Sequence, residues 1–242
     1  MRRLACVFAH PDDETFAAGG TLAKVAAAGD RIDLFCATDG DAGKTSGIPV
    51  ASRADLAARR RAELAAAARI LGIASLSTPG HGDGVLRDVD PDRLIGEIVY
   101  FLRRYQPDVV VTFGPEGAPT QHRDHRAISR AATAAFFLAP LESEYADQFR
   151  EVAAHRASRL YYCAWDAPDA SAELKALSVP ATCRIDVSAF LEVKRDTFLA
   201  HASQRQHQAR FEALAMSPSE SFALAAGVPQ PRAVTQSLFE GL

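Results

Sequence analysis

One histidine and three acidic residues stand close together in the segment FAHPDDETF at residues 8–16. They are His10, Asp12, Asp13 and Glu14, and they follow directly on an apolar run. Imidazole and carboxylate groups at this density can hold a divalent metal ion and move protons. Such a turn on its own is more often a helix cap, in which aspartates accept from free backbone N–H groups. A metal site therefore needs ligands from elsewhere in the chain.

A second cluster, in the segment QHRDHR, follows the apolar run DVVVTFG. It consists of His122, Asp124 and His125. Because the carboxyl ends of parallel strands meet at one edge of a sheet, we expect the two clusters to lie close together. Two histidines and a carboxylate are a common ligand set for catalytic zinc, and they leave a fourth position for water. We predict that His10, Asp13 and His125 bind zinc, although iron or cobalt also suits this set.

The remaining members of the two clusters have chemical roles that fit a metal-activated water. Asp12 lies beside a ligand and can accept the proton of that water. His122 is one helical turn from His125, so both side chains can face the cavity. Asp124 can hold the His122 imidazole in one tautomer and favour its protonated form. A protonated His122 would stabilise an oxyanion and then protonate a leaving amine.

The elements that must position these residues alternate between strands and helices. Strands are expected at residues 4–10, 30–40, 75–80, 107–114, 158–165 and 181–187, and helices at 13–29, 52–72, 91–106, 122–139 and 188–204. This alternation predicts an α/β fold, a Rossmann-like three-layer sandwich with a mostly parallel sheet and helices on both faces. No repeat or linker divides the chain, so residues 1–242 are expected to form a single domain.

Composition excludes several classes of partner. The net charge of −3 and the pI near 6.2 give no electrostatic footprint for nucleic acid or an anionic membrane. The longest apolar run is far shorter than the ~20 residues of a membrane span, and the N-terminal run is shorter than the roughly 7–15 residues of a secretory signal core. Four cysteines without a CxxC motif are expected to be buried thiols. We therefore predict a soluble cytoplasmic protein, and a homo-oligomer remains possible.

AHPDDE followed much later by HRDH resembles the LmbE-like or PIG-L family of zinc-dependent N-acetylglucosaminide deacetylases, whose usual motifs are AHPDDE and HPDH. The resemblance covers most of the chain. It extends to TDGDAGK at 38–44, RRAELAAAARILG at 60–72, GHGDGVL at 80–86 and KRDTFLAHASQ at 194–204. It implies that the protein removes an acetyl group from a small molecule containing N-acetylglucosamine.

The resemblance also implies roles residue by residue. His10, Asp13 and His125 become the zinc ligands and Asp12 the general base. His122 becomes the electrostatic catalyst and acid, with Asp124 orienting it. Arg60 and Asp83 match positions that contact the sugar.

Some of these positions have structural alternatives. Arg60 can instead pair with Glu63 on the same helix, and Asp83 can be a turn residue between two glycines. His201 is expected to pack the last helix against the sheet rather than to act in catalysis. Arg123, where the family usually has proline, and the loop at 115–121 depart from the family pattern and bear on substrate choice.

Three other functions remain as alternatives. An amidase of the same family would cleave a larger acyl group or a thiol-conjugate amide. A non-catalytic sugar-binding protein would need only part of the two clusters. A nucleotide-binding Rossmann protein is disfavoured, because the first strand is not followed by G-x-G-x-x-G and a phosphate would face three carboxylates. The sequence does not identify the aglycone.

Overall fold

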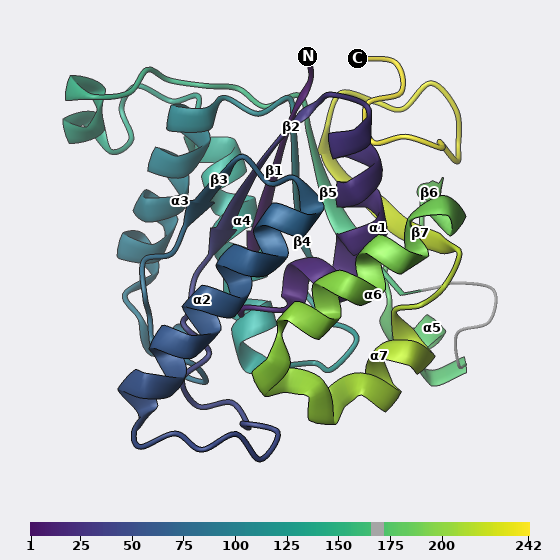
Figure 1. The fold of residues 1–242 in the computed structure, drawn as a ribbon. Helices are drawn as coiled ribbons and strands as arrows, with labels where there is room; N and C mark the ends of the chain where they lie inside the picture. The colour runs from purple at the N-terminus through teal and green to yellow at the C-terminus, as the bar shows by residue number, and fades with distance from the viewer. Residues whose placement is uncertain (166–171) are drawn as a thin grey trace.

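A seven-stranded sheet forms the centre of the protein in the computed structural model, which describes residues 1–165 and 172–242 (Figure 1). The strand order is β3-β2-β1-β4-β5-β7-β6. The strands are β1 (Arg3–Phe8), β2 (Arg31–Cys36), β3 (Ser75–Ser77), β4 (Val109–Phe113), β5 (Arg159–Ala164), β6 (Cys183–Asp186) and β7 (Ser219–Gly227). Strands β3, β2, β1, β4 and β5 pair in parallel, whereas β7 pairs antiparallel with both β5 and β6.

Helices cover both faces of this sheet. They are α1 (Asp13–Ala27), α2 (Arg53–Leu71), α3 (Pro91–Tyr105), α4 (Arg123–Leu138), α5 (Ala172–Leu177), α6 (Leu191–Ala200) and α7 (Gln208–Leu214). Short 3₁₀ turns are η1 (Leu86–Asp88), η2 (Ala146–Arg150), η3 (Ser188–Phe190) and η4 (Ala202–His207). Helices α1, α2 and α6 pack together on one face, and α3 packs on α4 on the other (Figure 1). The predicted three-layer α/β fold is confirmed.

Local sequence explains most of these elements. Strands β1 and β4 are apolar runs whose residues from Leu4 to Phe8 and from Val109 to Phe113 are fully or almost fully buried, as central parallel strands require. Helix α2 begins at Ser52, whose side chain accepts from the N–H of Asp55. It ends at Gly72, which adopts a left-handed conformation with φ of 71°.

The C-terminal third differs from the sequence prediction. The helix expected over 188–204 is interrupted, because α6 ends at Ala200 and His201 leaves the helical conformation. The chain then continues through η4 and α7, which lie beside the carboxyl ends of the central strands (Figure 1). Strand β7 was not predicted.

Within residues 1–165 and 172–242, none of the helices combines the length and the apolar character that crossing a bilayer demands.

Candidate active site

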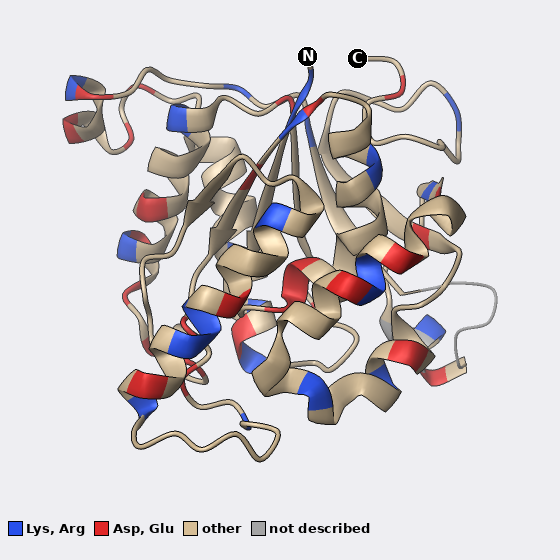
Figure 2. Ribbon diagram, in the orientation of Figure 1, with Lys and Arg blue, Asp and Glu red and all other residues tan. Residues whose placement is uncertain are grey.

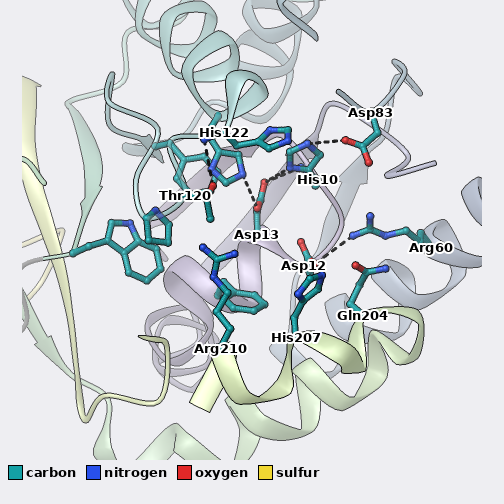
Figure 3. A pocket seen from close by; sticks show the side chains of 15 residues that line it. His10, Asp12, Asp13, Arg60, Asp83, Thr120, His122, Gln204, His207 and Arg210 are labelled. Carbon is teal, nitrogen blue, oxygen red and sulfur yellow. Dashed lines mark hydrogen bonds and ion pairs between the residues drawn. The ribbon is translucent and has the colours of Figure 1, made fainter. Parts of the chain in front are cut away.

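The two clusters found in the sequence meet at the carboxyl ends of β1 and β4. His10 follows β1, and His122 and His125 lie at the start of α4. Figure 3 shows the side chains of His10 and His122 next to each other. The ring centroids of His10 and His122 are 4.8 Å apart, and those of His10 and His125 are 5.2 Å apart. His125 also stacks on Phe113 at 4.0 Å between centroids, which fixes the plane of its imidazole.

Asp13, in the first turn of α1, connects two of these histidines. Its Oδ1 lies 3.2 Å from Nε2 of His125 and its Oδ2 lies 3.4 Å from Nδ1 of His10. Oδ2 also accepts from the N–H groups of Ala9 and His10. Burial alone would raise the pKa of Asp13, but the imidazoles of His125 and His10 hold that pKa well below its usual range. Asp13 is therefore an ionised carboxylate in a buried position.

These residues fit a divalent metal ion. Nitrogen atoms of His10, His122 and His125 all lie within 4.8 Å of one another, and the Asp13 carboxylate contacts two of the three imidazoles. Buried imidazoles beside an ionised carboxylate are the donors that zinc and other first-row divalent ions bind. The geometry brings together the predicted ligands His10, Asp13 and His125, and it adds His122 as a further nitrogen donor at the same place.

Asp12 is next to Asp13, but its environment is different. Its backbone has φ of 117°, a left-handed conformation that costs a non-glycine residue about 1–3 kcal/mol. The Asp12 side chain lines the pocket, with Oδ2 3.3 Å from a guanidinium nitrogen of Arg60. Burial raises the pKa of Asp12 to about 6, although Arg60 favours the charged form. A carboxyl group with such a pKa can accept a proton near neutral pH.

The contacts of the Asp124 carboxylate differ from the expected one with His122. Its carboxylate accepts from the N–H groups of Gly84 at 2.7 Å and Leu86 at 3.1 Å, and it faces Nε2 of His10 at 3.2 Å. The His122 imidazole is held instead by the backbone, because Nδ1 of His122 accepts from the N–H of Asp124 at 3.2 Å. The Asp124 carboxylate contacts the His10 imidazole, and it therefore orients His10.

His122 caps helix α4 and lines the pocket. Burial lowers its pKa, as do the neighbouring imidazoles of His10 and His125, while the Asp124 carboxylate acts in the opposite direction. The net shift is downward. The Asp124 carboxylate therefore raises the pKa of His122, as expected, but burial and the two imidazoles lower this pKa by more.

The two residues predicted to contact the sugar both lie at the pocket. Asp83 places Oδ1 3.1 Å from Nε2 of His10. Arg60 is only 3% exposed and donates to the carbonyl oxygens of Gly40 and Pro11 as well as to Asp12. The alternative pairing of Arg60 with Glu63 is wrong, because the Glu63 carboxylate accepts from the N–H and hydroxyl of Ser203.

The pocket around this site has a volume of about 240 Å³. Its outer wall contains residues that the sequence did not single out: Phe16, Trp165, His207 and Arg210. Gln204, from the KRDTFLAHASQ segment, lines it too (Figure 3). Of the loop 115–121, Pro119 and Thr120 reach the pocket, whereas Arg123 is exposed and does not line it. His207 and Arg210 come from the C-terminal segment beyond any recognisable motif.

Residues 5–136 match the family described as PIG-L, GlcNAc-PI de-N-acetylase. The chain belongs to this family. A 1D-myo-inositol 2-acetamido-2-deoxy-alpha-D-glucopyranoside deacetylase from Rhodococcus jostii is 34% identical over 248 residues, covering 84% of this chain and 82% of the relative. A probable N-acetyl-alpha-D-glucosaminyl L-malate deacetylase 2 from Bacillus cereus is 34% identical over 142 residues, covering 58% of this chain and 64% of that relative.

A solved structure supports the fold assignment. The N,N'-diacetylchitobiose deacetylase from Pyrococcus horikoshii superimposes with a TM-score of 0.77 at 21% identity, over 92% of this chain and 83% of that one. The predicted family membership is thus confirmed, and PIG-L enzymes of this kind are N-deacetylases, which places this chain among hydrolases of amide bonds.

Proposed function

We propose that this protein is a zinc-dependent hydrolase that removes the acetyl group from a small molecule containing N-acetylglucosamine. His10, Asp13 and His125 hold the metal ion. The observation that carries this proposal is the contrast between two adjacent carboxyl groups. Asp13 is held ionised between two imidazoles, while Asp12 faces the pocket with a pKa of about 6. One serves as a ligand and the other as a base.

When bound, zinc lowers the pKa of a coordinated water to about 7 and polarises the carbonyl of the substrate. Asp12 accepts one proton of the attacking water, whose oxygen forms the new bond to the acyl carbon. His122, which also lines the pocket, stabilises the charge that develops on the carbonyl oxygen. Asp12 then returns that proton to the nitrogen as the C–N bond breaks, so that acetate and a free amine leave.

The sugar lies against Arg60 and Asp83 in this proposal. Asp83 presents a carboxylate at the pocket wall, and such oxygens accept from sugar hydroxyls. Arg60 contributes less directly, because its guanidinium is already occupied by Gly40, Pro11 and Asp12. We assign Arg60 to holding the base as much as to binding the sugar.

The outer pocket receives the aglycone. Figure 2 shows acidic residues at the start of α1 and basic residues on the facing segment η4–α7. The Arg210 side chain points into the pocket (Figure 3). Within the described part of the chain it forms no salt bridge, in contrast to Arg60 and Arg61. An unpaired guanidinium favours a substrate whose aglycone carries a carboxylate or phosphate.

Strands from residue 3 to residue 227 share one sheet, which supports a single domain over 1–242. All four cysteines are buried free thiols, and burial raises the pKa of each, so they are unreactive; this supports a reducing compartment such as the cytoplasm.

A deacetylation screen tests the proposed function. The zinc-loaded protein is incubated with N-acetylglucosaminides that differ in aglycone and with analogues that carry longer acyl groups, and both acid and amine products are measured by mass. We expect acetate release that stops on chelation and returns with zinc. Hydrolysis of only the longer acyl analogues would identify an amidase instead. Tight sugar binding without turnover would identify a non-catalytic sugar-binding protein.

A further inference from the structure

A buried pair of titratable side chains lies directly behind the site and has no part in the chemistry described above. His201, at the end of α6, places Nε2 2.7 Å from Oε1 of Glu14 in the first turn of α1. His201 is 0% exposed and Glu14 is 1% exposed. The pair does not line the pocket, so it cannot contact the substrate.

The other oxygen of Glu14 connects this pair to Asp12. The N–H of Asp12 donates to Oε2 of Glu14 at 3.0 Å, and the hydroxyl of Thr15 donates to Oε1 at 2.6 Å. His201, the Glu14 carboxylate and the peptide of Asp12 therefore form one continuous hydrogen-bonded chain. It runs from helix α6 to the residue proposed as the base.

The backbone conformation of Asp12 explains why these hydrogen bonds matter. Its φ of 117° is unfavourable for a residue with a Cβ atom, so the peptide must be held by its neighbours. The N–H is held by Glu14, and the carbonyl oxygen accepts from the N–H groups of Thr15 and Phe16 at 3.0 Å each. Arg60 holds the carbonyl oxygen of the preceding residue, Pro11. In this conformation the Asp12 side chain lines the pocket.

We propose that His201 and Glu14 are positioning residues that hold the Asp12 peptide in its left-handed conformation and thereby aim the Asp12 carboxylate at the attacking water. The catalytic part of this inference rests on the proposed function, since it needs Asp12 to be the base. The geometric part does not. His201 fixes the Glu14 carboxylate, and Glu14 fixes the Asp12 N–H.

A second buried pair, Lys194 on α6 and Glu220 in β7, connects the same two helices and provides a matched control. Nζ of Lys194, also on α6, lies 2.5 Å from Oε1 of Glu220, and the Glu220 carboxylate accepts from the N–H groups of Gly20 and Thr21 in α1. This pair also joins α6 to α1, through Glu220, but within the described residues its hydrogen bonds do not include Asp12. Loss of helix packing alone would affect both pairs.

Kinetics of the zinc-loaded variants test the catalytic part. We expect His201→Leu and Glu14→Met to lower kcat by about tenfold or more. The KM should change less than about twofold, because neither residue contacts the substrate. His201→Gln keeps a donor near the Nε2 position and should recover most of kcat. Lys194→Met should retain the wild-type kcat. An equal loss of kcat in Lys194→Met would show that only helix packing is at work.

A double-mutant cycle with Asp12→Asn makes the test specific. If His201 acts through Asp12, adding His201→Leu to Asp12→Asn should change the residual kcat by less than about twofold. If His201→Leu lowers the residual rate of the Asp12→Asn protein by the same factor as in the wild type, the positioning role is excluded.

Hydrogen exchange tests the geometric part without any activity. In the metal-free protein, the Asp12 amide should be protected from exchange in the wild type and in Lys194→Met, and should lose that protection in His201→Leu and Glu14→Met. An Asp12 amide that exchanges rapidly in the wild type, or equally slowly in the Glu14→Met variant, overturns the proposal even where His201→Leu does not fold. A wild type that is protected at Asp12 but hydrolyses none of the N-acetylglucosaminides would reject the proposed function alone.

Discussion

Asp12 and Asp13 are consecutive residues whose carboxylates have opposite environments. Asp13 lies between the imidazoles of His125 and His10, which lower its pKa, whereas burial raises the pKa of Asp12 to about 6. The change of backbone conformation between them, from φ of 117° at Asp12 to the first helical residue at Asp13, sends the two side chains to different partners. One short motif thus supplies a metal ligand and a separate base.

Substituting the two aspartates one at a time should separate the role of the base from that of the metal ligand. Asp12→Asn should lower kcat by about 10²–10⁴-fold and leave the zinc content near one ion per chain, because the base is lost and the ligands remain. Asp13→Ala should lose zinc, measured by metal analysis after dialysis. Full zinc occupancy in Asp13→Ala together with loss of zinc in Asp12→Asn would mean that the two assignments are reversed.

Metal binding should also be visible in thermal unfolding. An ion that binds only the folded state at 100 times its Kd adds about 2.7 kcal/mol to the free energy of unfolding. We therefore expect zinc to raise the Tm of the chelator-treated wild type and of Asp12→Asn, but not that of Asp13→Ala or His125→Ala. Equal stabilisation of all four proteins would place the ion elsewhere.

Asp124→Asn should weaken metal binding rather than alter His122. The Asp124 carboxylate faces Nε2 of His10 and holds the loop at Gly84 and Leu86. Loss of such an outer partner of a ligand typically lowers metal affinity roughly 10–100-fold. Competition with a chromophoric chelator measures the affinity. If zinc affinity is unchanged and only kcat falls, the carboxylate acts on His122, as the sequence alone had suggested.

Much of this site could be predicted from the sequence, and the reason is physical. Short apolar runs such as those ending at Phe8 and Phe113, which alternate with helical segments, favour buried parallel strands. Parallel strands bring their carboxyl ends to one edge of the sheet, so the meeting of His10 with His125 was expected from topology. The direction of a side chain does not follow in this way. Asp124 turns toward His10 because two N–H groups of the Gly84–Leu86 segment attract its carboxylate, and that contact between distant loops leaves no trace in residue spacing.

The C-terminal segment was less predictable for a related reason. Strand β7 pairs antiparallel with β5, about sixty residues earlier in the chain. Its sequence, SESFALAAG, has little of the alternation that identifies a half-buried strand. Helix α6 ends where His201 makes its buried contact with Glu14, and such a contact between distant segments cannot be predicted from residue spacing. His207 and Arg210, which line the pocket, lie beyond this point in the chain.

The His201–Glu14 pair should also give the protein a pH-dependent stability. Burial alone would lower the pKa of His201, but Glu14 and Asp12 raise it above its usual value near 6.5, with Arg60 acting against them. A histidine with a raised pKa stabilises the folded state fully below its unfolded pKa, and the stabilisation is lost as the pH rises through the folded pKa. Urea unfolding of the metal-free protein should therefore show His201→Gln to be destabilised most near pH 6. The difference from the wild type should shrink by pH 9, and a constant difference would mean that His201 does not change charge.

Arg210 should determine which aglycone is accepted. Its guanidinium points into the outer pocket, and His207 beside it has a lowered pKa, first because of burial and then because of the cations Arg210, Lys44 and Arg60. We expect Arg210→Gln to raise KM about tenfold for an N-acetylglucosaminide with a carboxylate or phosphate on its aglycone, through loss of a charge-assisted hydrogen bond. Its KM for a neutral aglycone and its kcat for both should stay within about twofold. Arg205→Gln, a neutralisation on the same segment at an exposed residue that does not line the pocket, is the matched control. An equal rise in KM for charged and neutral substrates would show that Arg210 shapes the pocket wall and does not bind the charged group of the aglycone.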